Sequence, residues 1–370
     1  MGRRCLVLSA GMGAGHDAVA GELARRLRES GHEVLVRDVL TLLPAGTGAA
    51  VRGFYRCTVR HAPRLYEAIH AVFLAPAEPN RPATRRAGVS PLAALGERPL
   101  GALVGRWRPD VVVSTFHLAG QITGRMRARG ALRVPSAVFV TDFAVHRAWQ
   151  HPHNDLYLCV SPAAAEAVRA GTGRTTGAPG PVVPPAFHRA AAAGPSRWRA
   201  VLAGHGGDRP PVLLSAGAWG VGPGLTATAT ALAGHGCLPV LLCGHDERLR
   251  RRAARLPGVL ALGWVDDLPE LMSAARLLVD NAAGQTAVQA LAARLPVLGH
   301  RPIAGHGAQG VREMAAQGLT TFAADTRELL AAVDRLARPG PERDRRTARG
   351  AAVFRDDAAR LVAGLAERRT

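Results

Sequence analysis

A glycine-rich segment near the start of the chain ends in a histidine, in the sequence SAGMGAGH from Ser9 to His16. Glycines let a backbone come close to a ligand, and the start of a following helix favours negative charge. An imidazole has an ordinary pKa of about 6.5, so it can accept a proton near neutral pH. The segment therefore predicts a ligand-binding turn, in which His16 is either an acid–base group or a residue that caps or packs the helix.

The same segment departs from the pattern of a dinucleotide-binding loop. Such a loop has glycine at its first, third and sixth positions, which would be Gly11, Gly13 and residue 16. Residue 16 is a bulky histidine at a position where the helix must pack closely on the strand. Asp38 ends the next predicted strand, where an NAD-binding protein has an acid. The histidine nevertheless makes an NAD-dependent dehydrogenase the least favoured alternative.

A second glycine-rich turn follows a predicted strand in the other half of the chain. The strand PVLLSAG, residues 211–217, leads into Trp219, Gly220 and Gly222. Successive backbone N–H groups in such a turn form a concave site that suits phosphate. Two turns of this kind, one in each half, predict a ligand held between two domains.

The elements that must position these turns alternate along the chain as short apolar strands and helical segments. This alternation is typical of βαβ units around a parallel sheet. The predicted strands cover residues 5–10, 33–39, 110–116, 136–142, 156–161, 211–217, 239–244, 259–265, 277–282 and 296–302. We therefore predict an α/β protein with two Rossmann-like domains facing across a cleft.

The domain boundaries follow from the same pattern. A first Rossmann-like domain is expected over residues 1–185 and a second over residues 206–345. The segment between them, 186–205, lies in a stretch rich in Pro and Gly and is predicted to be a linker. Residues 346–370 are expected to end in a helix that packs back on the first domain.

The composition narrows the classes of function and partner. Of the 370 residues 47 are basic and 28 acidic, and the formal net charge is +19. Every basic residue is Arg, a pattern that accompanies GC-rich codons, so the charge carries little weight and no nucleic-acid partner is expected. Attraction to acidic surfaces does not depend on that origin, and a weak preference for an anionic membrane remains.

The cysteines and the hydropathy of the sequence indicate the cellular compartment. The five cysteines are scattered and never form a CxxC pair, which argues against a disulfide framework and a zinc site. The N-terminus has only about five apolar residues after its arginines, as a first strand does, and no stretch reaches the roughly 18 that span a bilayer. We expect a cytoplasmic protein whose membrane contact is peripheral, at the inner face of the cell membrane.

Residues 42–100 carry few strand signals but a regular series of arginines. Arg52, Arg56, Arg60 and Arg64 recur every four residues with no acid among them. On a helix they form one basic ridge, bordered by aromatics, as in a segment that contacts a membrane interface. The predicted membrane contacts are Arg52, Phe54, Tyr55, Arg56 and Arg60. The alternative is a solvated helical face whose aromatic residues belong to the core.

Several segments together resemble a known family. They are SAGMGAGH, VTDFAVHRAW, GPVVPPAF, RPIAGHG and the long block GWVDDLPELMSAARLLVDNAAGQTAVQALAARLPVL. In this order they resemble the GT-B glycosyltransferases of the monogalactosyldiacylglycerol synthase and processive diacylglycerol glucosyltransferase group. That group is related to the peptidoglycan glycosyltransferase that acts on lipid I. The match covers nearly the whole chain, and residues 45–105 are the least alike.

The resemblance implies an activity. A hexosyl group would pass from a nucleotide sugar, expected to be a UDP-sugar, to a hydroxyl of a lipid or lipid-like acceptor, with inversion. No cofactor and no metal is expected, because helix and backbone N–H groups would stabilise the leaving diphosphate. The adjacent Asp266 and Asp267 are interpreted as caps of the following helix and not as a metal-binding pair.

The resemblance also implies roles for single residues. His16 corresponds to the general base, and Asp142 to a carboxylate that orients it or binds the acceptor. The other residues on the acceptor side are Gly13, Gly15, His146 and Trp149. The donor-binding residues are Gly217, Trp219, Gly220 and Gly222 at the diphosphate, the Val265 backbone at the uracil edge, Gly284 and Thr286 at the phosphates, Gln289 at the ribose, and His306 at the sugar.

The donor side departs from the family pattern at three positions. The motif GGxTxxEA occurs here as AGQTAVQA, so Ala283 replaces a glycine and Gln289 replaces the glutamate that accepts hydrogen bonds from both ribose hydroxyls. Losing a charge-assisted bond costs on the order of 1–3 kcal/mol. Gly310 stands where asparagine is common.

These departures keep several alternatives open. They are a soluble glycosyltransferase of specialised metabolism, a UDP-sugar-binding protein with weakened catalysis, and a nucleotide-sugar epimerase. The epimerase would need carboxylates for proton transfer that the sequence does not place.

Overall fold

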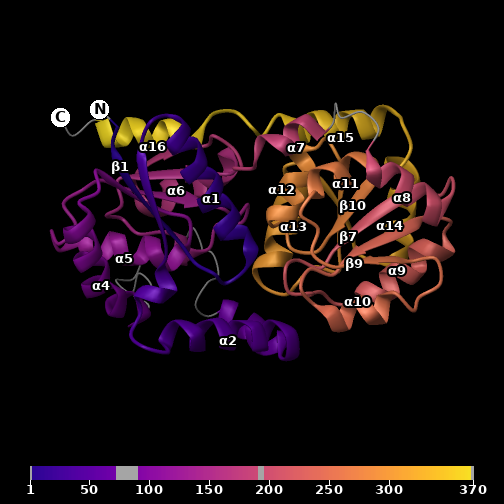
Figure 1. Ribbon diagram of the computed structural model, residues 1–370, viewed down its shortest axis with the longest axis horizontal. Helices are drawn as coiled ribbons and strands as arrows, with labels where there is room; N and C mark the ends of the chain where they lie inside the picture. Colours follow the sequence, from indigo (N-terminus) through magenta and orange to yellow (C-terminus); the bar gives the residue numbers. More distant parts are fainter. Residues whose placement is uncertain (1, 72–90, 191–195, 368–370) are drawn as a thin grey trace. The chain divides into compact units, whose positions relative to one another are not determined.

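Each half of the chain folds around its own parallel six-stranded sheet (Figure 1). The computed structural model describes residues 2–71, 91–190 and 196–367. The chain divides into two compact units: unit 1 comprises residues 1–182 and 353–370, and unit 2 comprises residues 183–352. The predicted α/β class is confirmed.

In unit 1 the sheet order is β2-β1-β3-β4-β5-β6, with every pair parallel. The strands are β1 (Arg4–Ser9), β2 (Glu33–Asp38), β3 (Val111–Ser114), β4 (Ser136–Val140), β5 (Leu156–Cys159) and β6 (Thr175–Gly177). The helices are α1 (Ala14–Glu29), α2 (Thr47–His61), α3 (Pro63–Ile69), α4 (Pro91–Trp107), α5 (His117–Ala128), α6 (Pro162–Thr172) and α16 (Ala358–Glu367). Strands β3 and β4 are buried throughout, which explains their continuous apolar sequences.

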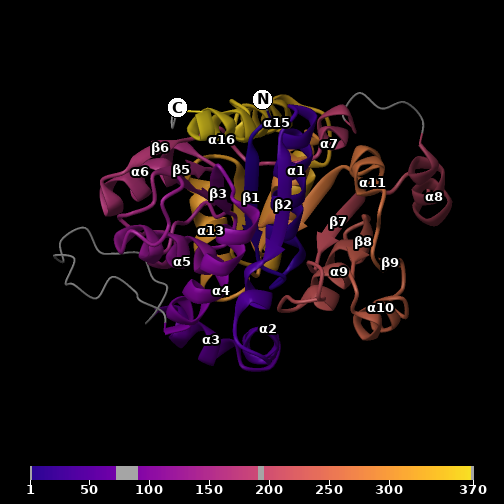
Figure 2. The same cartoon turned by 60° about the vertical axis from the view of Figure 1, so that its left-hand side comes forward.

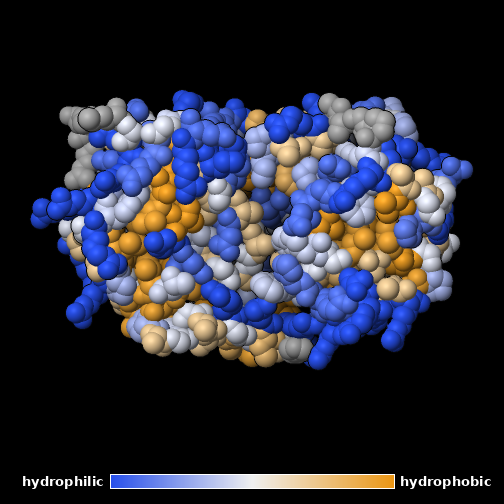
Figure 3. Space-filling model, in the orientation of Figure 1, coloured by the Kyte–Doolittle hydropathy of each residue, from blue (hydrophilic) through white to orange (hydrophobic). Residues whose placement is uncertain are grey.

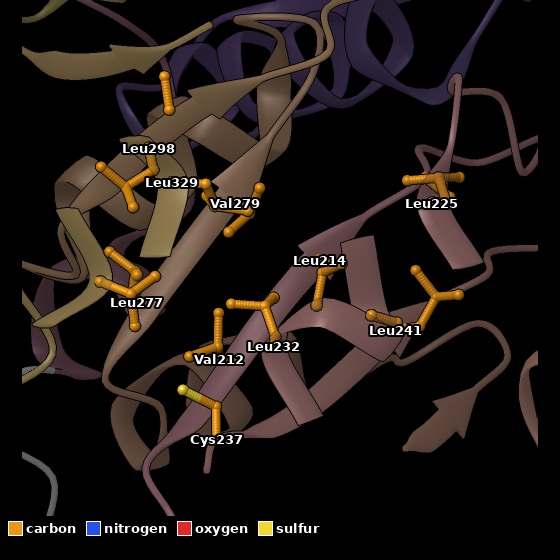
Figure 4. Packing of buried hydrophobic residues seen from close by; sticks show 14 of the residues in the cluster. Val212, Leu214, Leu225, Leu232, Cys237, Leu241, Leu277, Val279, Leu298 and Leu329 are labelled. Atoms are coloured by element: carbon orange, nitrogen blue, oxygen red, sulfur yellow. The ribbon is translucent and has the colours of Figure 1, made fainter. Parts of the chain in front are cut away.

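In unit 2 the sheet order is β12-β11-β10-β7-β8-β9, again parallel. The strands are β7 (Pro211–Ser215), β8 (Leu238–Leu242), β9 (Leu260–Leu262), β10 (Leu277–Asp280), β11 (Val297–His300) and β12 (Thr320–Ala323). The helices are α7 (Pro185–Ala190), α8 (Arg197–Gly206), α9 (Leu225–Gly234), α10 (Glu247–Ala253), α11 (Leu268–Ala274), α12 (Gln285–Ala292), α13 (His306–Ala316), α14 (Thr326–Leu336) and α15 (Pro341–Ala351). Side chains of the central strands and of α9 and α14 form its core (Figure 4).

The strand order places both glycine turns at equivalent points. In unit 1, β1 lies between β2 and β3, and in unit 2, β7 lies between β8 and β10. Loops that leave the carboxyl ends of such neighbouring strands run in opposite directions and leave room for a ligand. Residues 10–13 follow β1, and residues 216–224 follow β7.

The C-terminal segment belongs to unit 1. Helix α16 packs on α1 and β3, and the views in Figure 1 and Figure 2 both show it beside α1. The backbone N–H of Arg355 donates to the carbonyl of Pro179 at 2.8 Å, and Arg26 of α1 pairs with Asp357 at 3.2 Å. The structure divides at residues 182 and 352, whereas the sequence placed the boundaries at 185 and 345.

The segment predicted as a linker instead carries helices. Within 186–205 lie most of α7 and α8, and both belong to unit 2. Pro185 begins α7, where proline removes no helical hydrogen bond, and Ser196 precedes α8. In this segment the prolines and glycines, which predicted a linker, thus occur at the start of a helix as well as in loops.

Candidate functional site

His16 lies in the first turn of α1, directly after β1, and its ring is held by the neighbouring strand. Its Nδ1 is 2.9 Å from the carbonyl oxygen of Thr115, which follows β3. A carbonyl oxygen can only accept, so Nδ1 carries the hydrogen and Nε2 keeps its lone pair. The ring is thus set as a proton acceptor at Nε2.

The surroundings of His16 favour its neutral form. Burial lowers the pKa of His16, although the charge of Asp142 and the bond to Thr115 oppose this effect. The ring packs edge-on against Phe116, with centroids 5.0 Å apart, and its centroid lies 6.2 Å from that of Trp149. A neutral imidazole at pH 7 is the form that a general base requires.

Asp142 follows β4 and is anchored by three side chains. Its Oδ2 accepts from Trp149 Nε1 at 2.8 Å and lies 3.5 Å from His146 Nε2. Its Oδ1 accepts from the Thr141 hydroxyl at 3.2 Å, and that hydroxyl is 3.3 Å from His16 Nδ1. The structure thus brings Asp142 and His16 together through Thr141.

The other residues predicted on the acceptor side differ in their access. Trp149 is fully buried and His146 is 4% exposed, so in this conformation both support Asp142 rather than offer a surface to an acceptor. Gly13 is the N-cap of α1, and a Cβ added there would meet open space. Gly15 lies in the first turn of α1.

The Asp38 carboxylate forms a hydrogen bond and an ion pair within unit 1. Its Oδ1 accepts from the Leu40 N–H at 2.8 Å, and its Oδ2 pairs with Arg52 at 2.9 Å. Arg52 therefore faces the loop after β1, where a Cβ on Gly11 would come 3.2 Å from its Nη2. This ion pair opposes the dinucleotide alternative, and it corrects the prediction that Arg52 contacts a membrane.

The predicted membrane-contact residues separate onto two faces of α2. The helical period places Arg52, Tyr55 and Val59 on the packed face. The Tyr55 ring meets Tyr66 of α3 edge-on at 5.7 Å, and burial, with the charge of Asp142, raises the pKa of Tyr55 to about 12. Tyr55 thus faces the Asp142 loop, contrary to the prediction, whereas Phe54, Arg56 and Arg60 are exposed.

The glycine turn of unit 2 is tied to the loop after β10. Gly217 and Gly220 adopt φ of +62° and +67°, a region open to glycine. A Cβ on Gly222 would lie 2.1 Å from Asn281 Nδ2, which donates to the Val221 carbonyl at 3.1 Å. Only glycine at position 222 allows the two loops to approach so closely.

An aromatic stack lies beside this turn. The His245 ring stacks on Trp264, with centroids 4.5 Å apart and planes 9° apart, and its centroid is 5.7 Å from that of Trp219. Trp264 is half exposed and precedes Val265, the residue expected at the base edge. Trp219 therefore has an aromatic neighbour in His245, a residue that the sequence analysis did not single out.

The loop after β10 presents the start of α12. Buried Asp280 accepts from the N–H groups of Ala282 and Ala283, at 3.0 and 2.6 Å, and burial raises its pKa. Gly284 is the N-cap of α12, with Thr286 in its first turn. A helix start of this kind favours an anion.

The two remaining donor residues lie on helices. Gln289 is half-buried one turn into α12, and its side chain makes no hydrogen bond with the other residues that the structure describes. His306 begins α13. Asp267 precedes α11, but its carboxylate accepts from Trp198 Nε1 at 2.9 Å instead of capping that helix, which corrects the prediction for Asp267.

Two of the departures from the family pattern are in contact. Ala283 holds φ at +53°, and a Cβ on Gly310 of α13 would come 3.0 Å from the Ala283 Cβ. A larger residue at 310 therefore needs a smaller one at 283. Gly310 leaves the space that the Ala283 methyl group occupies.

We expect Gly310→Asn to lower the free energy of unfolding by about 1–3 kcal/mol, because the contact with Ala283 becomes overpacked. In an Ala283→Gly background the same substitution should cost clearly less. Urea denaturation of the four proteins measures the coupling. Additive effects of the two substitutions would show that the contact does not link them.

Within the described residues, no three His, Cys, Asp or Glu side chains are placed to hold a metal ion. None of the described helices combines the length and hydropathy needed to span a bilayer.

The structural comparisons decide the fold. MurG of Acinetobacter baumannii superimposes with a TM-score of 0.56 at 14% identity over 99% of both chains. HepE of Anabaena, solved in complex with UDP-glucose, gives 0.59 at 16% identity over 99% of both chains. The chain has the GT-B fold. At these identities the likeness shows the fold alone.

The predicted resemblance to the diacylglycerol group is also confirmed. The family model of monogalactosyldiacylglycerol (MGDG) synthase matches residues 16–178 of this GT-B chain. The processive diacylglycerol beta-glucosyltransferase of Bacillus subtilis is 25% identical over 57% of the chain and 56% of its own length. That of Staphylococcus carnosus is 24% identical, over 62% and 59%. The alignments thus span little more than half of these relatives.

Proposed function

We propose that this GT-B chain is an inverting, metal-independent glycosyltransferase that moves a hexosyl group from a UDP-sugar to a hydroxyl of a lipid or lipid-like acceptor. The observation that carries the proposal is the His16 ring, which the Thr115 carbonyl fixes with Nε2 as proton acceptor. Support comes from relatives named processive diacylglycerol glucosyltransferases and from a structural neighbour that holds UDP-glucose.

The proposed reaction is a single displacement. His16 Nε2 takes the proton of the acceptor hydroxyl, and the hydroxyl oxygen forms a bond to the anomeric carbon of the donor. The bond from that carbon to the diphosphate oxygen breaks, and UDP leaves. Backbone N–H groups of the glycine turn and the start of α12 would stabilise its negative charge.

The donor is tested by thermal shift with a panel of nucleotide sugars, followed by transfer assays on a crude lipid extract with the best donor. We expect a UDP-sugar to raise the Tm and a glycosylated lipid to form. A chain whose Tm no UDP-sugar raises, and which hydrolyses none, would contradict the donor assignment.

The decrease of activity at acidic pH should follow the protonation of His16. Because burial lowers its pKa below the ordinary 6.5, His16 is deprotonated at neutral pH. We expect kcat/KM to be constant near pH 7 and to fall as the pH decreases through a value below 6.5. The lowered pKa of His16 also makes the folded chain lose stability as the pH falls from the ordinary 6.5 toward the pKa of the folded state. An acidic limb centred above 6.5 would contradict this assignment.

We further propose peripheral contact with an anionic membrane through the outer face of α2 and α3, in a cytoplasmic protein without a nucleic-acid partner. Phe54 and Leu65 are 56% and 51% exposed, and Arg56, Arg60 and Arg64 are exposed on the same two helices. Figure 3 shows hydrophilic side chains interleaved with hydrophobic patches on the face in view. Basic residues beside exposed apolar ones are typical of interfacial segments.

Replacing Arg56, Arg60 and Arg64 by Gln should weaken binding to phosphatidylglycerol vesicles about 100-fold at low salt, from about 1 kcal/mol per arginine. Co-sedimentation measures this. The matched control replaces Arg248, Arg251 and Arg252, three exposed arginines of α10, by Gln. Equal losses in both triples would indicate a general charge effect. No binding by the natural chain would favour the soluble acceptor of specialised metabolism.

A UDP-sugar-binding protein with weakened catalysis is the second candidate, and Gln289 is the observation that favours it. Its amide offers one acceptor oxygen where a carboxylate offers two.

A further inference from the structure

Arg301 follows β11 and lies against the glycine turn of unit 2. A Cβ on Gly224, the N-cap of α9, would come within 2.1 Å of Arg301 Nη1 and 3.1 Å of its Cζ. The guanidinium therefore rests directly on the backbone of this turn. Arg301 is half-buried and holds φ at +44°, so its backbone directs the side chain from the strand end toward residues 222–224.

The Arg301 guanidinium is not paired with a carboxylate in the part of the chain that the structure describes. Within the described residues its guanidinium makes no hydrogen bond either, and it rests on the backbone of Gly224. Asp280, which lines the same small cavity, already accepts from the N–H groups of Ala282 and Ala283. A half-buried cation without an anion is unfavourable, so this position suits an anionic ligand.

His300, the residue before Arg301, adds no positive charge, so Arg301 is the cation that an anion would meet at this position. His300 Nδ1 is 3.0 Å from the carbonyl oxygen of Ala323 and therefore donates to it. Burial lowers the pKa of His300, and the nearby Arg301 lowers it further, so the ring is neutral at pH 7.

Arg301 also lies between the two loops expected to hold phosphate. It touches the turn at Gly224, and it lines one cavity with Ser215, at the end of β7, and Asn281, at the start of the loop after β10. A guanidinium presents several N–H donors in one plane and binds phosphate oxygens through two of them at once. From this position it can reach an anion held over both loops.

We propose that Arg301 binds the diphosphate of the nucleotide donor and supplies the positive charge of a site otherwise built from backbone N–H groups. The inference rests on the proposed function for the identity of the donor. It assigns to Arg301 a role that the glycine turns and the start of α12 were expected to fill alone.

The test is isothermal titration of the natural chain and of Arg301→Gln with UDP, uridine and inorganic pyrophosphate. Arg301→Gln should bind UDP and pyrophosphate at least ten-fold more weakly and uridine equally well. Arg301→Lys should keep part of the UDP affinity. The matched control is Arg294→Gln, because Arg294 is an exposed arginine of the same unit with a similar φ of +53°. Urea denaturation checks that both glutamine variants are folded.

The outcomes separate this inference from the proposed function. If the natural chain binds UDP and Arg301→Gln binds it equally well, the role of Arg301 is overturned and the UDP-sugar proposal stands. If binding of pyrophosphate depends on Arg301 but no uridine nucleotide binds, the anion site stands and the donor proposal fails. Equal losses in Arg301→Gln and Arg294→Gln would also overturn the role of Arg301. Binding of neither UDP nor pyrophosphate by the natural chain overturns both.

Discussion

Replacing His16 by Ala is expected to lower kcat for sugar transfer by about 100- to 10,000-fold, the usual contribution of a positioned general base. The neutral ring presents Nε2 because the Thr115 carbonyl holds Nδ1. Without this acceptor, the hydroxyl must attack while it still carries its proton. The proposed donor-binding residues belong to the other unit, so the affinity for UDP should change little.

The measurement is initial-rate transfer with the best donor, with titration of UDP in parallel. His205→Ala is a matched control, because His205 Nδ1 is also 2.9 Å from a backbone carbonyl, that of Val201, but its ring is exposed and belongs to unit 2. Turnover should survive in this variant. Undiminished turnover in His16→Ala would remove the general-base role, and lost UDP affinity would indicate a wider structural effect.

The parts of the site that were predictable from sequence are those at strand ends. Buried parallel strands are short apolar runs, and a glycine turn after such a run marks the carboxyl end of a strand. This pattern located β1, β7 and both turns. It also placed His16 and Asp142 on one edge of a sheet, because β1, β3 and β4 are neighbours in the sheet order.

The side chains that fix His16 carried no comparable signal. Thr115 contributes its backbone carbonyl, which any residue would supply, and Thr141 is an ordinary residue after a strand. Trp149 was expected to face an acceptor because a family motif contains it, yet its indole N–H donates to Asp142 from a fully buried position. The burial of Trp149 depends on how the loop after β4 folds back over Asp142, and the spacing of residues in the sequence does not specify this.

The missed strands and the divided face of α2 have simple physical causes. Strands β6 and β12 have three and four residues, lie at sheet edges and begin with threonines, so they lack an apolar run. On α2 the arginine spacing of four suggested one exposed ridge. The partner of Arg52, Asp38, lies 14 residues away on β2, and the arginine spacing alone does not reveal which of the arginines has such a partner.

Restoring a carboxylate on α12, by Gln289→Glu, should strengthen UDP binding about 5- to 150-fold, corresponding to the 1–3 kcal/mol of charge-assisted bonds. Gln289 is half-buried and its side chain makes no hydrogen bond with the other described residues, so a glutamate side chain can occupy the same space. A carboxylate can accept from both ribose hydroxyls at once. The gain should be smaller for 2′-deoxy-UDP, which lacks one of them.

Titration of both nucleotides with both proteins separates a ribose contact from a general effect of charge. An equal gain with UDP and 2′-deoxy-UDP, or weaker UDP binding, would place residue 289 away from the ribose. Parallel transfer assays decide between the two candidate functions. If the natural chain turns over and Gln289→Glu mainly lowers KM, Gln289 tunes the donor affinity of an active enzyme. If transfer is detectable only in the Gln289→Glu variant, the natural chain is a UDP-sugar-binding protein that lost catalysis through this one residue.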